Sequence, residues 1–207
     1  MKKLTLLLVL SASLGMKAQD SISSPRLGIT SGISTLAVGM SSPALHAGLS
    51  FSSGKHEVYI TSFFVSSLYD MKGTFPGFGA GYQFYPNGIH NRFDLLFAYD
   101  FIYFSARPEY IYPSNGPAWA PVAMGRSLKE IENYLGFGFR AKIISHLFFS
   151  ASVGIGAGKS QEEIYWRYAD GTKQYSDNGY NEAFALHGKI RITYHFLELK
   201  KKKKDVK

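Results

Sequence analysis

The chain lacks cysteine, and this absence excludes disulfide bridges and a lipoprotein anchor. After residue 19 it also lacks any run of 18 or more apolar residues, so no membrane-spanning helix is expected there. The net positive charge is small away from the two ends. Of the net charge of +8, Lys2, Lys3 and Lys17 carry three and residues 197–207 carry four, which leaves about +1 for residues 20–196. A basic surface for nucleic acid is therefore not expected.

The first residues predict export from the cytoplasm. Lys2 and Lys3 precede an apolar run from Leu4 to Leu14, and small and polar residues follow up to Asp20. A basic start, a short apolar run and a small residue near the junction are typical of a secretory signal peptide. We expect residues 1–19 to be removed and the mature chain to form a single domain.

What the mature sequence does have is alternation of apolar with small or polar residues. In the last segment Leu186, Ile190 and Ile192 alternate with Lys189 and Arg191, a period of two that indicates a β-strand and not a helix. Turn-forming residues separate eight such segments. They run from Arg26 to Val38, Ala44 to Phe51, Glu57 to Leu68, Gly77 to Tyr85, Arg92 to Ala106, Ile131 to Ile144, Leu147 to Gly158 and Ala183 to Phe196.

The connections between these segments alternate in length. Residues 52–56, 86–91 and 145–146 are short connections, whereas 69–76, 107–129 and 159–182 are longer. Tight turns at one end and long loops at the other, with both termini at the turn end, are typical of outer-membrane barrels. The sequence therefore predicts an all-β fold, an eight-stranded antiparallel up-and-down transmembrane β-barrel.

Residues 26–196 resemble the small outer-membrane β-barrel family, which includes OmpX-like, OmpW-like and OmpA-domain barrels. The final strand, Lys189 to Phe196, is similar to the C-terminal signal read by the barrel-insertion machinery, although residues 197–207 follow it here. The resemblance implies a monomer in a Gram-negative outer membrane, in contact with its lipid and lipopolysaccharide. It divides the chain into a signal peptide (1–19), a barrel (20–196) and a basic, disordered periplasmic tail (197–207).

The polar face of each segment is expected to line the barrel interior. Eight strands leave room for side chains but not for an open channel. Because an unpaired buried charge costs several kcal/mol, the inward charges should form ion pairs, with Asp94 opposite Lys142 and diagonal to Arg140. A narrow ion or proton path, using His187 and His195, is the alternative to a closed plug. The predicted network comprises Glu57, Asp94, Asp100, Glu132, Arg140, Lys142, Lys189 and Arg191.

Alternation alone does not say which face meets lipid. A soluble lipocalin-like barrel would turn the apolar face inward around a ligand. The Gly- and Ser-rich polar face, the alternating loop lengths and the aromatic end of the last strand at Tyr194 and Phe196 favour the membrane arrangement.

The two longest connections are rich in aromatic residues. Such side chains are suited to binding an external ligand, because they bury a large area at small entropic cost. The alternative is that they continue the strands and pack against each other or against lipid headgroups. The candidates are Tyr110, Tyr112, Trp119, Tyr165, Trp166 and Tyr168.

Motifs for chemistry are weak. No His-x-Ser pair of the lipid A deacylase type occurs, and a triad of Ser150, His187 and Glu132 would have to form in space. The histidine spacing offers no chelating pair, and each Gly-x-Gly lies inside a strand. We therefore predict no catalytic residue, no metal and no cofactor.

The expected function is a non-enzymatic barrel with a plugged polar lumen that supports envelope integrity or presents external binding loops. The alternatives are a lipid-modifying enzyme or a narrow conduit for small apolar molecules. The tail at Lys200 to Lys204 is either a solvated end or a contact with anionic headgroups or the cell-wall polymer.

Overall fold

The computed structural model describes residues 24–35, 43–68, 71–89, 92–107, 109–111 and 120–199. Within them no helix is long and apolar enough to cross a membrane. The described elements are strands: β1 (Arg26–Thr35), β2 (Pro43–Ser53), β3 (His56–Leu68), β4 (Met71–Phe84), β5 (Phe93–Ala106), β6 (Glu109–Ile111), β7 (Ala123–Ile144), β8 (Leu147–Arg167) and β9 (Lys173–Glu198).

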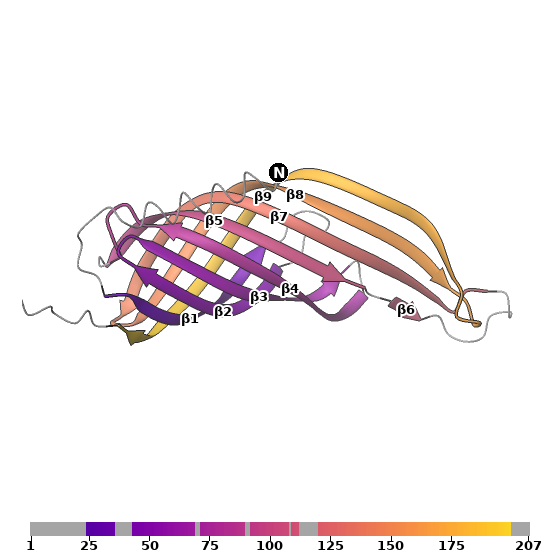
Figure 1. Ribbon diagram of the computed structural model, residues 1–207, viewed down its shortest axis with the longest axis horizontal. Helices are drawn as coiled ribbons and strands as arrows, with labels where there is room; N and C mark the ends of the chain where they lie inside the picture. The colour runs from indigo at the N-terminus through magenta and orange to yellow at the C-terminus, as the bar shows by residue number, and fades with distance from the viewer. Residues whose placement is uncertain are drawn as a thin grey trace, which may run out of the picture.

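The strands close into a barrel (Figure 1). Each strand from β1 to β4 pairs antiparallel with the next, β5 pairs with β7, β7 with β8, β8 with β9, and β9 returns to β1. The short β6 pairs with β7 outside this ring. The predicted eight-stranded antiparallel barrel is confirmed.

The strands are staggered around the ring, as barrel closure requires. If one starts at Arg26 and steps from each residue to its register partner on the next strand, one circuit of the barrel ends at His187 of β9. His187 lies nearer the loop end of β9 than Lys189, which is the register partner of Ser34 on β1. This stagger tilts the strands against the barrel axis, as Figure 1 shows.

The two faces of the wall have opposite chemistry. On β9, Lys189 and Arg191 are buried, whereas Leu186, Ile190 and Ile192 are 77%, 51% and 48% exposed. The outward apolar positions run from Phe184 to Phe196, about 28 Å across a bilayer at ~3.3 Å per residue and a tilt of about 45°. This matches the apolar band of a transmembrane barrel, ~25 Å tall. A polar interior inside an apolar outer surface is the architecture of such a barrel.

The turn end of the barrel follows the sequence closely. Ser145 and His146 alone connect β7 to β8, as predicted, and Gly54 adopts a φ of 62° in the turn between β2 and β3. Beyond the predicted end of the barrel, β9 continues to Glu198, which forms an ion pair with Arg26 at 3.5 Å.

The predicted long connections at the opposite, loop end are corrected. Strands β3 and β4 continue until Leu68 pairs with Met71, so residues 69–76 are not a long loop. Residues 123–129 belong to β7, and most of 159–182 belongs to β8 and β9. The alternation was hidden there because the residues are polar on both faces and the register shifts between Ile164 and Tyr165.

Strands β7, β8 and β9 extend well past the other strands at the loop end (Figure 1). They contain 22, 21 and 26 residues, against 10–14 in β1 to β5. Strand β5 ends at Ala106, opposite Leu128, and β6 pairs with β7 beyond that point. We call β6 with residues 123–127, 163–167 and 173–178 the protruding sheet.

Several predicted features lie outside the described residues. These are the signal peptide, the end of the first segment at Val38, the candidate binding residues Tyr112 and Trp119, and the tail at Lys200 to Lys204.

Candidate functional site

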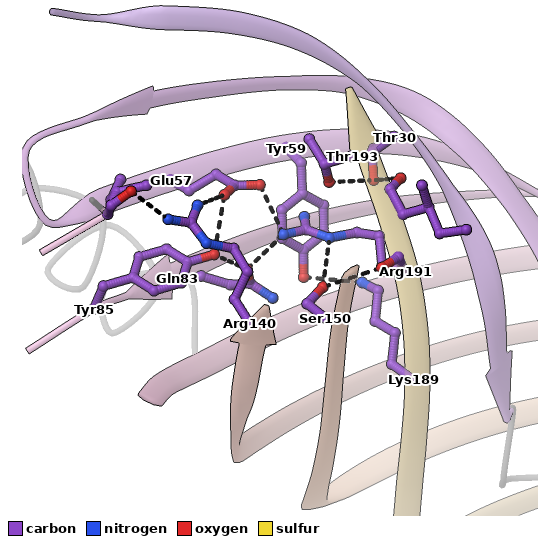
Figure 2. Close-up of polar contacts among 12 residues, drawn as sticks. Thr30, Glu57, Tyr59, Gln83, Tyr85, Arg140, Ser150, Lys189, Arg191 and Thr193 are labelled. Carbon is purple, nitrogen blue, oxygen red and sulfur yellow. Dashed lines mark hydrogen bonds and ion pairs between the residues drawn. The ribbon is translucent and has the colours of Figure 1, made fainter. Parts of the chain in front are cut away.

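Glu57 on β3 is the centre of the charged interior, because two arginines from other strands approach it (Figure 2). Arg191 Nη2 lies 2.7 Å from Glu57 Oε1, and Arg140 Nη1 lies 3.5 Å from Oε2. The hydroxyl of Tyr85 donates to Oε2 at 3.0 Å. All three charged side chains are at most 2% exposed, so water screens their interaction little.

Arg140 also joins β7 to β5 and to the turn end. Its Nη2 lies 3.2 Å from Asp94 Oδ2 and donates to the carbonyl oxygen of Ile89 at 2.8 Å. Its guanidinium carbon lies 4.3 Å from the ring centre of Tyr85 and 4.5 Å from that of Phe148. Arginine suits this position because its planar guanidinium donates hydrogen bonds to carboxylates at its edge and stacks on aromatic rings at its faces.

A second ion pair lies beside the first. Lys189 Nζ is 2.6 Å from Asp100 Oδ1, and the hydroxyl of Tyr59 donates to the same carboxylate oxygen. The Tyr59 ring lies 4.1 Å from Lys189 Nζ and 4.4 Å from the guanidinium carbon of Arg191, which connects the two groups (Figure 2). Gln83 accepts a hydrogen bond from Arg191 at 2.5 Å.

The structure brings together six of the eight predicted network residues in these ion pairs: Glu57, Asp94, Asp100, Arg140, Lys189 and Arg191. Glu132 is buried on the same inner face of β7. Lys142 was placed wrongly: its side chain is exposed at the turn end, and the residue opposite Asp94 is Arg140. The expected register was therefore off by two residues, which keeps the inward face but moves the partner along the strand.

Sequence reasoning missed the neutral partners of these charges. Tyr59, Gln83 and Tyr85 hold the ion pairs in place, and Glu130 is a further buried carboxylate. The signal was present in part, because Tyr59 shares the inward parity of Glu57 and Thr61. Which polar side chain meets which charge depends on contacts across the lumen, and these are not encoded in the alternation.

Toward the loop end a buried apolar cluster shares the interior with the buried carboxylates of Glu130 and Glu132. Ala185 of β9 packs against this cluster. Its members are Ala44, Phe63, Ile102, Phe104, Ala106, Leu128 and Tyr134.

The structure does not assemble the triad of Ser150, His187 and Glu132. Ser150 Oγ contacts Arg191, and its register partner is also Arg191, whereas His187 pairs with Gly154, about 13 Å along the strand at ~3.3 Å per residue. His187 Nδ1 instead lies 2.8 Å from the carbonyl oxygen of Thr35. Within the described ranges, no three His, Cys, Asp or Glu side chains are placed to hold a metal ion.

The predicted binding aromatics that fall within the described residues lie on the protruding sheet and its turn. Tyr110 of β6, Met124 of β7, Trp166 of β8 and Gln174 of β9 form one cross-strand row, so they share a face. The hydroxyl of Tyr168, in the β8–β9 turn, donates to Gln174 Oε1 at 2.8 Å. Tyr110 is 51% exposed. Tyr110 and Trp166 therefore continue the strands, whereas Tyr168 lies in the turn that joins β8 and β9.

The opposite face fixes the shape of this sheet. Tyr165 packs over Gly125 and lies 4.4 Å from Lys173 Nζ. Arg167 donates two hydrogen bonds to Glu109, at 2.7 and 3.3 Å, which tie β8 to β6 and raise the pKa of Arg167. At the base of the sheet, a hydrogen bond from Lys159 lowers the pKa of Glu182. The sheet is thus ordered by surface contacts and not by a core.

No family model matches the chain, and no curated protein matches it. Among solved structures, the chain is similar to the outer-membrane protease OmpT from Escherichia coli, with 10% sequence identity and a TM-score of 0.38, over 84% of this chain and 95% of that chain. A resemblance this distant assigns neither a family nor an activity.

Proposed function

We propose that this protein is a non-enzymatic outer-membrane barrel, closed to diffusion, that presents the protruding sheet outside the cell as a binding surface. The observation that carries the proposal is the sheet itself, which keeps a fixed shape beyond the barrel while exposing aromatic side chains. A preorganised surface of this kind binds with little further loss of conformational entropy. Export by the signal peptide and insertion by the barrel-insertion machinery would bring the protein to the outer membrane.

The interior supports a closed barrel. Arg140, Arg191 and Lys189 point into the lumen, each is at most 3% exposed, and each is engaged by a carboxylate. On the loop side of these groups, the buried apolar cluster fills part of the lumen. An ion path would need hydrated space between these groups, and a conduit for apolar molecules would have to pass the ion pairs.

The interior also argues against an enzyme. Ser34 Oγ lies 3.0 Å from His46 Nδ1, a pairing that could activate a serine at an open site. Both residues are 1% exposed, so a substrate does not reach them. Their hydrogen bond is better explained as satisfaction of two buried polar groups.

The test is a shortened protein in which a two-residue turn replaces residues 163–178 and joins Glu162 to Gly179, which are register partners in the intact sheet. Vesicles carrying either form are exposed to surfaces coated with lipopolysaccharide, collagen or dextran. We expect the intact protein to hold vesicles on at least one surface and the shortened form to lose this retention. A heat-dependent gel shift in both forms shows that the barrel folds without the sheet.

Equal retention of both forms on every surface would overturn the binding role. A deletion strain then separates the remaining possibilities. If both forms restore resistance to vancomycin, the barrel wall alone supports envelope integrity. A change in the lipid A mass spectrum that depends on the protein would favour the enzyme instead, and steady conductance in a planar bilayer would contradict a closed lumen.

A further inference from the structure

The outer wall of the barrel contains a groove of about 510 Å³ that runs across β7, β8, β9 and β1. Its exposed lining is apolar and includes Ile33, Phe137, Phe139, Val153, Gly188 and Ile190. Ser34, Ser152 and Lys189 also border it, but their side chains are buried on the inner face, with at most 9% exposure. The groove therefore opens toward the outside of the barrel.

The groove exists because side chains are missing from the wall at this point. Gly188 occupies an outward position of β9 between Leu186 and Ile190, and its register partner on β8 is Val153. At the neighbouring outward position of β8, the small side chain of Ala151 lies between its register partners Ile190 and Phe139. A Cβ atom added to Gly188 would meet nothing closer than Thr35 Oγ1 at 3.7 Å, so the backbone does not require glycine here. The depression is open space and not the consequence of a close backbone approach.

We propose that this groove holds one acyl chain of a phospholipid, an inference that rests on the membrane location proposed above. The groove lies within the outward apolar band, where the surrounding solvent is hydrocarbon. Three strand spacings of ~4.8 Å make it about 14 Å long across the strands; because the strands are tilted by about 45°, it spans about 10 Å of the ~30 Å hydrocarbon core, within the depth of one leaflet. A chain in the groove gains dispersion contacts on three sides that a chain on a convex wall does not.

Charge identifies the lipid as a phospholipid and not lipopolysaccharide. The headgroup of lipopolysaccharide carries several phosphates, and binding them would need exposed cations beside the groove. Among its lining residues Lys189 is the one cation, and it is buried and paired with Asp100. Lys159, farther along β8, is engaged by Glu182. This surface fits the acyl chain of a phospholipid, whose headgroup does not need several cations on the protein.

The test fills the groove and counts retained lipid. Gly188→Leu places a side chain in the groove, and Ala157→Leu adds the same side chain to an exposed outward position of β8 that does not line it. Each protein is reconstituted in dipalmitoyl phosphatidylethanolamine vesicles, transferred to detergent and examined by native mass spectrometry. We expect the wild type and Ala157→Leu to retain one bound lipid and Gly188→Leu to lose it.

Equal retention by all three proteins, or retention by none, would overturn the proposal. Reconstitution with lipopolysaccharide forms a second arm, and preferential retention of lipopolysaccharide would overturn the choice of lipid. The heat-dependent gel shift separates the two levels of the argument. If the wild type shows no shift, the membrane barrel itself fails; if the shift is normal and retention is unaffected by Gly188→Leu, only the groove assignment fails.

Discussion

Three long strands, β7, β8 and β9, run through both the barrel wall and the protruding sheet, yet different forces hold the two regions. In the wall, side chains of β7 and β9 alternate between a buried charged interior and an exposed apolar surface. In the protruding sheet, Tyr165 and Ala123 are buried, whereas Tyr175 and Ile111 are 58% and 68% exposed. The sheet relies on ladder hydrogen bonds, a tilted contact between the rings of Tyr165 and Tyr175, and ion pairs of Arg167 with Glu109 and of Arg126 with Glu162.

This difference teaches that one strand can serve two purposes in succession. In the barrel wall, an unpaired buried charge would be costly because it is shielded from water, so each inward charge needs an ion-pair partner. In the protruding sheet, exposed ion pairs contribute little, so the sequence is free to place aromatic and polar residues for binding. Changes in the wall should therefore affect the whole molecule, and changes in the protruding sheet should remain local.

Glu57→Leu should have the largest effect, because it leaves Arg140 and Arg191 buried without their shared carboxylate. Breaking a buried pair typically costs about 3–5 kcal/mol, so the free energy of unfolding in urea should fall by this order. The measurement is urea unfolding of the protein in lipid vesicles. Lys142→Leu is the control, since Lys142 is exposed; a similar loss in both variants would contradict a lumen-specific role.

Gly81→Ala should come next. The added Cβ would lie 2.1 Å from Tyr59 Cζ and would push the ring away from Asp100 and Lys189. Overpacking of this kind usually costs about 1–3 kcal/mol. Gly188→Ala in the same barrel meets no atom within 3.4 Å and should unfold like the wild type. Equal unfolding curves for both variants would show that the Tyr59 ring is not fixed.

Arg167→Ala should affect the protruding sheet alone. Loss of both hydrogen bonds to Glu109 frees β6 from β8, so the amides of Tyr110 and Ile111 should exchange with solvent faster. Amide exchange followed by mass spectrometry reports this, and the barrel peptides should stay unchanged. Faster exchange in β5 or in residues 184–196 of β9 would indicate that the sheet and the wall unfold together.

Asp170 should give the smallest effect, confined to the β8–β9 turn. Hydrogen bonds from the hydroxyl and the backbone N–H of Thr172 lower the pKa of Asp170. Their contribution is present above the ordinary pKa of aspartate and is lost as the pH falls through the lowered value. The protection of the Gly171 and Thr172 amides, measured relative to their intrinsic exchange rates at each pH, should therefore fall in acid in the wild type. Asp170→Asn should remove this pH dependence, because the amide does not titrate.

The barrel was predictable because the position of each wall residue in the strand alternation decides whether it faces hydrocarbon or the interior. Phe184, Leu186 and Ile190 must face hydrocarbon, so their parity alone assigns the inner face to Lys189 and Arg191. The two-residue turn at Ser145 fixed the β7–β8 register. Distances between strands that are not neighbours were not predictable, and this is why Tyr59 and Gln83 were missed. Lys142 was included because the expected register between the neighbouring strands β5 and β7 was off by two residues.

The protruding sheet was not predictable for a related reason. Neither of its faces meets hydrocarbon, so residues such as Gln161, Glu163 and Gln174 are compatible with strand or loop alike. The shift between Ile164 and Tyr165 breaks the alternation where it would otherwise have been visible. Aromatic residues drew attention to the region, but only the strand pairing shows that Tyr110 and Trp166 share a face.

The shared carboxylate of Glu57 has a consequence for how the barrel is made. Its partners belong to β7 and β9, and Asp100 of β5 likewise waits for Lys189 of β9. A partly assembled sheet would therefore carry unpaired charges into the bilayer. The carboxylates of Glu57 and Asp100 are fully paired only when β9, the last strand, closes the ring. Biogenesis should accordingly proceed through a sheltered intermediate, with closure and membrane entry as one event.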